Sequence, residues 1–497
     1  METLLSNNNF YKIFTENKID YNTLHDIINN LNNSLLNELF KYNISKIKIN
    51  AYLFDNINIK LLFDYIFNNN IQINKINIKF NENTNDNNKL LYITELYKFS
   101  NTLFNIYFNY SHIDLNKNEL FNIFIKKCKI NKVSIYGSEL GFYYDKKSYI
   151  LTDIINELLI NNNIKILNYL IEYDDYEFYD SIIKNNSLEK LYIRRSQNYG
   201  LSSIVKNIST LKKVMIYSDN DEDMNELITT NKSLEKLNIY GDKFHKSKNH
   251  KNFFKTLENN KTIKSLELNS ASKENIQLLS ETLIINNHIE TLILNDNIDY
   301  CIIFKTLQNN KTVKYLKINL QENNIDDFIE LLNNNNTIIK INLTINYINS
   351  NINHIILLKL INCLKNNKNI QYLQIYTSIN NNDFQLLTDL IKTNNTIKDL
   401  IILFSDIEYN FIFDKELLNA ILNNNTIKNI YINNYYKLIK VNSDNNFKIV
   451  QLPFKYNITF DDIVIKNNSL KYFILDDKII YKNDNNKIII LNYKKDF

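Results

Sequence analysis

Residues 309–318 read Asn-Asn-Lys-Thr-Val-Lys-Tyr-Leu-Lys-Ile, and this pattern is the repeating unit of the chain. A helical pattern ends in the Asn-Asn pair, a connector of two or three residues follows, and a strand of the form apolar-x-x-apolar-x-apolar completes the unit. The unit recurs at least eleven times, for example at residues 185–193 and 259–268. Such recurrence is typical of repeat proteins, so we expect one stacked array rather than a series of separate domains.

The spacing of the central strand residue gives the period of the array. From Leu191 to Ile430, successive central residues lie 23 to 32 positions apart. Within one unit, residues 266–268 alternate between the two faces of a strand, whereas the apolar residues of segment 276–283 follow helical spacing. Each unit is therefore predicted to pair a strand with a helix, and neighbouring units must stack to bury the apolar faces of both.

One unit gives the best match in the chain to a known repeat pattern. Residues 289–298 read Ile-Glu-Thr-Leu-Ile-Leu-Asn-Asp-Asn-Ile, which resembles the leucine-rich repeat pattern Leu-x-x-Leu-x-Leu-x-x-Asn-x-Leu, with Asn297 at the asparagine position. The resemblance covers most of residues 43–475 and is particularly to the ribonuclease-inhibitor-like subtype, in which each unit carries a full helix. It implies an α/β solenoid, a horseshoe or arc with a parallel β-sheet on the concave face and helices on the convex face.

The ends of the chain differ from its middle. We expect residues 1–42 to form a helical N-terminal cap, residues 43–180 to form degenerate repeats with central residues from Ile47 to Val133, and residues 181–435 to form regular repeats. Residues 436–497 are predicted to hold an irregular last repeat at 467–475 and a C-terminal β-hairpin cap. Caps are expected because the terminal repeats of a solenoid otherwise expose their core.

The Asn-Asn pairs predict how the helices end. A helix commonly stops with a residue in the left-handed conformation, usually Gly, and Asn tolerates that conformation next best. The chain has only four Gly residues, whereas residues with AT-rich codons such as Asn, Ile and Lys are abundant. We therefore expect Asn to replace Gly as the left-handed helix terminator in this asparagine-rich chain.

Composition and spacing argue against several classes of function. A formal net charge of +4 over 497 residues does not single out a nucleic acid or a membrane as the partner. The chain shows no glycine-rich phosphate loop, no catalytic motif and no metal-ligand spacing among its six His and three Cys residues. We expect no enzyme activity, no cofactor, no metal and no small-molecule substrate. The absence of a signal-peptide pattern and of a bilayer-spanning apolar run predicts a cytoplasmic or nuclear protein without membrane contact.

The strand residues between the buried ones carry the candidate binding surface. If the resemblance holds, they point into the concave face, where strands ~4.8 Å apart would stack lysines of successive units into a positive column beside tyrosines. The positions are Lys190, Tyr192 and Arg194 in one unit, Lys213, Met215 and Tyr217 in the next, and Lys236, Asn238 and Tyr240 in the third. We expect the partner to bind Lys190, Tyr192, Arg194, Lys213, Tyr217, Lys236 and Tyr240. The alternative is that a lysine-rich chain places lysines on any solvated strand face.

Three functions are compatible with such an array. The first, which we favour, is a non-enzymatic protein–protein interaction scaffold that holds a protein partner of unknown identity on the concave face. The second is a substrate-recognition subunit of a ubiquitin ligase, with residues 1–42 as a diverged adaptor-binding segment. The third is binding of a nucleic acid or a phosphorylated segment by the Lys/Tyr strip, for which a steep salt dependence is expected.

Overall fold

The structure of the chain is a computed structural model. The chain divides into two compact units, Met1–Tyr240 and Gly241–Lys494. Most of the segment 1–42, together with Arg194 and Asn297, lies outside the described residues. The described residues are 18–19, 45–50, 53–54, 57–80, 93–99, 102–109, 127–136, 159–160, 164–170, 176–193, 208–217, 221–240, 250–269, 271–295, 298–345, 350–377, 383–404, 416–417, 423–424, 426–427, 429–432, 436–439, 451–452, 472–475, 478–482 and 488–492, with the single residues 24, 124 and 420.

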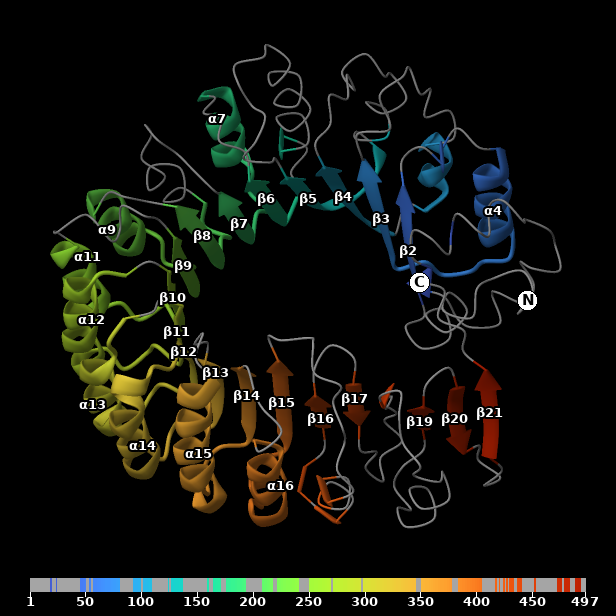
Figure 1. The fold of residues 1–497 in the computed structure, drawn as a ribbon. Helices are drawn as coiled ribbons and strands as arrows, with labels where there is room; N and C mark the ends of the chain where they lie inside the picture. The colour runs from blue at the N-terminus through green and yellow to red at the C-terminus, as the bar shows by residue number, and fades with distance from the viewer. Residues whose placement is uncertain are drawn as a thin grey trace. The chain divides into compact units, whose positions relative to one another are not determined.

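The first unit is a parallel β-sheet with helices along one side (Figure 1). From β1 to β9, each strand pairs in parallel with the next, with a register shift between Phe104 and Asn105 where β4 meets β5. The strands are β1 (Lys18–Ile19), β2 (Lys46–Asn50), β3 (Lys75–Phe80), β4 (Leu103–Asn109), β5 (Ile130–Tyr136), β6 (Ile166–Leu170), β7 (Lys190–Ile193), β8 (Lys213–Tyr217) and β9 (Lys236–Tyr240). The connections carry α4 (Ile57–Asn68), the 3-10 helix η4 (Ile93–Phe99), α7 (Tyr176–Lys184) and α9 (Asp221–Thr230).

The second unit repeats the arrangement with more regular helices, which form an outer layer behind an inner layer of strands (Figure 1). The parallel strands are β10 (Ser265–Leu268), β11 (Thr291–Leu294), β12 (Tyr315–Asn319), β13 (Lys340–Ile345), β14 (Tyr372–Thr377), β15 (Asp399–Phe404) and β16 (Asn429–Ile432). The helices are α11 (Lys251–Glu258), α12 (Lys273–Ile285), α13 (Cys301–Asn309), α14 (Ile325–Asn334, preceded by the 3-10 helix η6, Glu322–Asn324), α15 (Ser350–Asn366) and α16 (Asp383–Thr393).

Alternation along each strand builds the core. In β12, Leu316 and Ile318 are buried, whereas the residues between them are partly exposed. Parallel pairing places Leu316 between Leu292 of β11 and Ile341 of β13, so the buried residues of successive strands form one apolar column. The prediction of an α/β, leucine-rich-repeat-like solenoid with a parallel sheet and a helical layer is confirmed.

Buried and half-buried asparagines link eight of the described repeats to the ones before them. The Nδ2 group of Asn335 donates to the backbone carbonyls of Leu307 and Asn310 at 2.6 and 3.0 Å. Its Oδ1 atom accepts from the backbone N–H groups of Thr337 and Ile338, both at 2.8 Å. We call the residues that make both kinds of contact the asparagine ladder: Asn185, Asn231, Asn286, Asn310, Asn335, Asn367, Asn394 and Asn424.

The expectation that these asparagines end helices in the left-handed conformation is wrong. Asn286, Asn310 and Asn335 have φ between −70° and −94° and ψ between 122° and 131°, which is extended backbone. Among the described residues, Asn70 at the end of α4 is the one non-Gly residue with positive φ, at 52°. The ladder positions need the amide side chain, which satisfies buried carbonyl and N–H groups that would otherwise lose their water, and they do not need unusual backbone freedom.

The parallel series ends near the C-terminus. Strand β17 (Tyr436–Ile439) pairs antiparallel with β16. A separate sheet contains β18 (Gln451–Leu452), β19 (Tyr472–Leu475), β20 (Lys478–Lys482) and β21 (Ile488–Asn492), and β19, β20 and β21 pair antiparallel in that order. The β20–β21 hairpin lies where the sequence predicts one, while β19, predicted as a last repeat strand, pairs with the hairpin instead. No helix in the described part of the chain is long and apolar enough to cross a membrane.

Candidate partner-binding face

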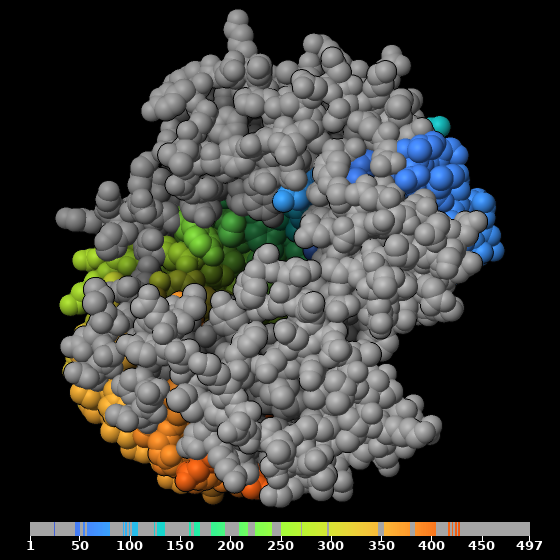
Figure 2. Space-filling view, turned by 45° about the vertical axis from the view of Figure 1, so that its right-hand side comes forward, coloured from blue at the N-terminus to red at the C-terminus, as the bar shows by residue number. Residues whose placement is uncertain are grey.

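The predicted lysine column forms on three adjacent strands of the first unit. Lys190, Lys213 and Lys236 share one register across β7, β8 and β9. Lys190 and Lys236 are exposed and Lys213 is half-buried. Their strands, coloured green, form part of the surface seen in Figure 2. Because adjacent strands lie ~4.8 Å apart, the backbones that carry neighbouring lysines of the column are closer together than the Debye length of about 8 to 10 Å.

The tyrosines lie beside this column in two further registers. Tyr192 is half-buried, and the Nζ atom of Lys213 lies 5.1 Å from the centroid of its ring, a cation–π contact. Tyr217 and Tyr240 share a register on β8 and β9, and Tyr240 is half-buried. The structure thus brings these residues onto one face, except for Arg194, which lies outside the described residues. Their role in binding stays a prediction.

A neighbouring row of side chains is nearly neutral. Backbone hydrogen bonds connect Lys165, Glu189, Lys212 and Glu235, the residues immediately before β6 to β9, in that order. The Nζ atom of Lys165 lies 2.8 Å from a carboxylate oxygen of Glu189. This hydrogen bond, aided by the positive charges of Lys165, Lys212 and Lys190, lowers the pKa of Glu189. The edge of the face therefore alternates in charge, whereas the lysine column beside it does not.

Sequence reasoning missed the lysines that continue the column upstream. Lys132 on β5 pairs with Ile166 on β6, which in turn pairs with Lys190 on β7. Further upstream, Lys46 on β2 pairs with Lys75 on β3. The signal was available, because each of these three lysines directly precedes a central strand residue of the degenerate repeats. They were overlooked because those repeats match the consensus poorly.

Burial and mutual repulsion act on two of these lysines. Desolvation lowers the pKa of Lys75, and the charges of Lys132 and Lys46 lower it further. Desolvation also lowers the pKa of Lys132, together with the charge of Lys190. The Nζ atom of Lys132 lies 5.1 Å from the ring centroid of Tyr107, which resembles the arrangement of Lys213 over Tyr192.

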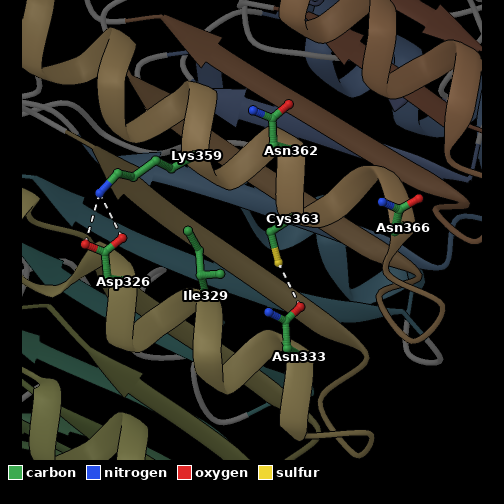
Figure 3. Close-up of a pocket in the computed structure, with 7 residues that line it drawn as sticks. All are labelled: Asp326, Ile329, Asn333, Lys359, Asn362, Cys363 and Asn366. Carbon is green, nitrogen blue, oxygen red and sulfur yellow. Dashed lines mark hydrogen bonds and ion pairs between the residues drawn. The ribbon is translucent and has the colours of Figure 1, made fainter.

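The helical side of the second unit has a hollow of about 440 Å³ between α14 and α15 (Figure 3). Its charged residues neutralise each other, because Lys359 contacts both carboxylate oxygens of Asp326 at 2.8 and 3.0 Å. The thiol of Cys363 faces Asn333, with Sγ 3.5 Å from Oδ1, and burial raises the pKa of Cys363 to about 11. The hollow therefore presents no activated nucleophile.

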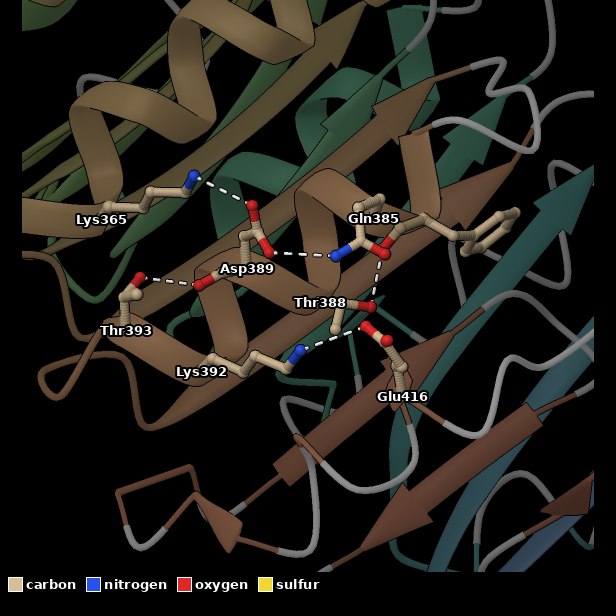
Figure 4. A network of polar contacts seen from close by, with 8 residues as sticks. Lys365, Gln385, Thr388, Asp389, Lys392, Thr393 and Glu416 are labelled. Carbon is tan, nitrogen blue, oxygen red and sulfur yellow. Dashed lines mark hydrogen bonds and ion pairs between the residues drawn. The ribbon is translucent and has the colours of Figure 1, made fainter.

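Polar contacts also tie α15 and α16 together (Figure 4). Asp389 accepts from Lys365 at 3.3 Å and from Gln385 at 3.2 Å, and Lys392 lies 3.2 Å from Glu416. These partly exposed pairs connect consecutive repeats and account for their charges without a ligand. Among the described residues, no three His, Cys, Asp or Glu side chains gather to hold a metal ion.

The cysteines allow a direct chemical prediction. Burial raises the pKa of Cys128 to about 12, and burial together with hydrogen bonds to Asp299 and Asp327 raises that of Cys301 to about 12. At pH 8 we expect the native thiols to react with iodoacetamide at least ~100-fold more slowly than in the unfolded chain, since the thiolate is the reactive form.

Mass spectrometry of each alkylated cysteine measures these rates. Because Cys301 is only half-buried, Asp327→Asn should speed its alkylation and leave that of Cys128 unchanged. Equal rates for native and unfolded protein would contradict the assigned protonation state.

These features define a class, a leucine-rich-repeat-like solenoid with a basic patch on its strand face. No family model and no curated protein matches the chain. Among solved structures, the chain is similar to one described as "Crystal structure of TLR13-ssRNA13 complex", at 12% sequence identity and a TM-score of 0.26. That match covers 92% of this chain and 61% of the other, so the chain spans less than two thirds of that protein.

Proposed function

We propose that the chain is a non-enzymatic scaffold that holds a protein partner on the strand face of its first unit. The observation that supports this most is the single register shared by Lys190, Lys213 and Lys236, with the half-buried Tyr192 and Tyr240 beside them. Pairing of the strands fixes the backbone of this face before a partner binds, and tyrosines are frequent anchors of protein interfaces.

A protein partner fits this face better than a single-stranded nucleic acid. Sequence-tolerant binding of single strands relies on aromatic rings that are open for stacking. The rings of Tyr192 and Tyr107 already have lysine ammonium groups over them, each 5.1 Å from the centroid. The residues beside the lysines therefore favour charge recognition over base stacking.

We also propose the ribonuclease-inhibitor-like subtype and an intracellular site of action. The described helices of the second unit run from 8 residues in α11 to 17 in α15, which fits a subtype with a full helix in each unit. Cys128, Cys301 and Cys363 are all free thiols, as is usual in a reducing cytoplasm or nucleus.

The test compares partners captured by the wild-type chain with those captured by Lys190→Glu, Lys213→Glu, Lys236→Glu. In a matched control variant, three exposed lysines are replaced by Glu. These lysines follow asparagines in loops of the second unit and are Lys261, Lys311 and Lys368. We expect a nuclease-resistant protein partner that is lost with the first variant and kept with the control.

Direct binding of the purified partner then serves as the second measurement, and Tyr192→Ala should weaken it about tenfold or more, as truncation of an interface anchor does. Partners that bind both triple variants equally would overturn the assignment to this face.

A further inference from the structure

Lysine dominates one strand position in the first unit but not in the second. Six of the eight strands β2 to β9 carry a lysine immediately before a buried core residue, with Leu103 and Ile166 as the exceptions. Lys46 and Lys75 share a register with Leu103, whereas Lys132 pairs with Asn105 and belongs to the register that continues through Ile166 to Lys190, Lys213 and Lys236. We call Lys46, Lys75, Lys132, Lys190, Lys213 and Lys236 the lysine row.

The second unit is an internal control for composition. Its corresponding residues are Ser265, Thr291, Tyr315, Lys340, Tyr372, Asp399 and Asn429, with one lysine in seven. The chain has 58 basic residues among 497, so a random position on eight strands would hold about one. A lysine-rich composition therefore does not account for the row.

The lysine row has no internal counter-ions. Among the described residues, none of its six members forms an ion pair, although lysines elsewhere do, as in Lys165–Glu189 and Lys314–Glu290. Glu189 acts on Lys190 at longer range, since the charge of Lys190 contributes to lowering the pKa of Glu189. The charges of the residues immediately before β6 to β9 thus balance one another, whereas the described residues provide no ion-pair partner for the lysine row.

The charges of the row lysines affect one another on both sides of the register shift at Phe104. The charges of Lys46 and Lys132 both lower the pKa of Lys75, and that of Lys190 lowers the pKa of Lys132. Repulsion of this kind opposes folding, and an anion placed along the row would relieve it. Polar side chains near the lysines bond to one another: the Nδ2 group of Asn105 donates to Asn77 at 2.9 Å and that of Asn168 donates to Ser134 at 3.0 Å, while the buried Oδ1 atom of Asn168 has no hydrogen-bond partner among the described residues.

We propose that the lysine row binds an acidic segment, rich in Asp and Glu, that lies across strands β2 to β9. The proposal deepens the proposed function by naming the chemistry of the partner, and so it rests on that function. Seven steps of ~4.8 Å give a row of ~34 Å, the length of about ten residues of extended chain. Lysine ammonium groups are point charges that impose no planar geometry on a ligand, so a row of them suits a diffuse run of carboxylates.

The experiment measures binding of a fluorescent peptide of about ten glutamates to the full chain by anisotropy. A glutamine peptide and a single-stranded oligonucleotide of equal length serve as comparisons. The row variant is Lys46→Gln, Lys75→Gln, Lys132→Gln, which spares the strip tested by partner capture. The control variant is Lys261→Gln, Lys311→Gln, Lys368→Gln, which removes the same charge from exposed loops of the second unit.

We expect the glutamate peptide to bind, the glutamine peptide not to bind, and the row variant to weaken binding about tenfold. The control should change affinity less than about twofold, and higher salt should weaken binding to the wild type. Without peptide, the row variant should melt at the same temperature as the wild type or higher, because repulsion is removed. The peptide should raise the melting temperatures of the wild type and the control variant by similar amounts and that of the row variant by less.

Three results would overturn the proposal: no binding of the glutamate peptide, equal losses in both variants, or tighter binding of the oligonucleotide through the same lysines. The outcome is separable from that of the proposed function. If a captured protein partner binds the row variant as well as it binds the wild type, the proposed scaffold function is retained, but the proposal that the row binds an acidic segment is rejected. Conversely, the glutamate peptide could bind at the lysine row while no captured partner depends on Lys190, Lys213 and Lys236. That result would support binding of an acidic segment by the row and would contradict the proposed scaffold function.

Discussion

Asn335→Ala is expected to lower the free energy of unfolding by about 3–5 kcal/mol. Asn335 is 5% exposed, and its amide satisfies two carbonyls of the preceding repeat and two N–H groups of the loop that leads into β13. Alanine supplies neither donor nor acceptor, so several buried backbone groups would lose their partners at once. Urea unfolding followed by far-UV circular dichroism measures the change.

The chain contains its own control for this substitution. Asn335 lies within a run of four asparagines, and Asn336 beside it is exposed. We expect Asn336→Ala to change the free energy of unfolding by less than about 0.5 kcal/mol, as is usual for surface substitutions. If both variants lost the same stability, the loss would reflect loop conformation, and the ladder would not be the stabilising element.

Phe304→Ala is expected to destabilise the chain by a similar amount, about 3–5 kcal/mol, through a cavity. Phe304 is fully buried on α13, and its ring lies 5.2 Å from that of Phe328 on α14 and 6.3 Å from that of Tyr300. Removing it takes contacts from two consecutive repeats, so the helices on both sides lose packing. Differential scanning calorimetry should show a lower melting temperature.

The matched control lies on the same helix. Ile302 is 38% exposed, and Ile302→Ala should cost less than about 1 kcal/mol because little apolar surface returns to water. A loss for Phe304→Ala no larger than that for Ile302→Ala would mean that the helical layer contributes little to the stability of the array.

Local periodicity was sufficient to predict the repeat architecture and the alignment of Lys190, Lys213 and Lys236. The apolar-x-apolar motif marks which strand residues are buried, and parallel stacking of identical motifs fixes which exposed residues become neighbours. The same logic extends to Lys46 and Lys75, which pair with each other and precede Ile47 and Ile76. Lys132 could have been identified from its position before Val133, but its pairing with Asn105 places it in a different register.

Two features were not predictable from spacing alone. Counting periods selects Ile106 as the central residue after Ile76, yet Ile76 pairs with Phe104, and Ile106 pairs with Ile78 on β3 and with Val133 on β5. The register between β4 and β5 also shifts between Phe104 and Asn105. A bulge adds a residue to one strand without changing the pattern on either side. The role of the ladder asparagines also depends on burial against the preceding repeat, which local propensity does not encode.

The asparagine ladder fixes the loop and the strand of a repeat but not the length of its helix. Helices of 8 residues in α11 and 17 in α15 occur in the same unit, yet ladder amides in that unit donate to main-chain carbonyls at 2.6 to 3.2 Å. The ladder holds the loop and the strand that follows it, so insertions can accumulate in the helical layer while neighbouring strands keep their alignment. The outer side of a repeat can therefore gain or lose whole turns of helix without a change in the alignment of the strand face.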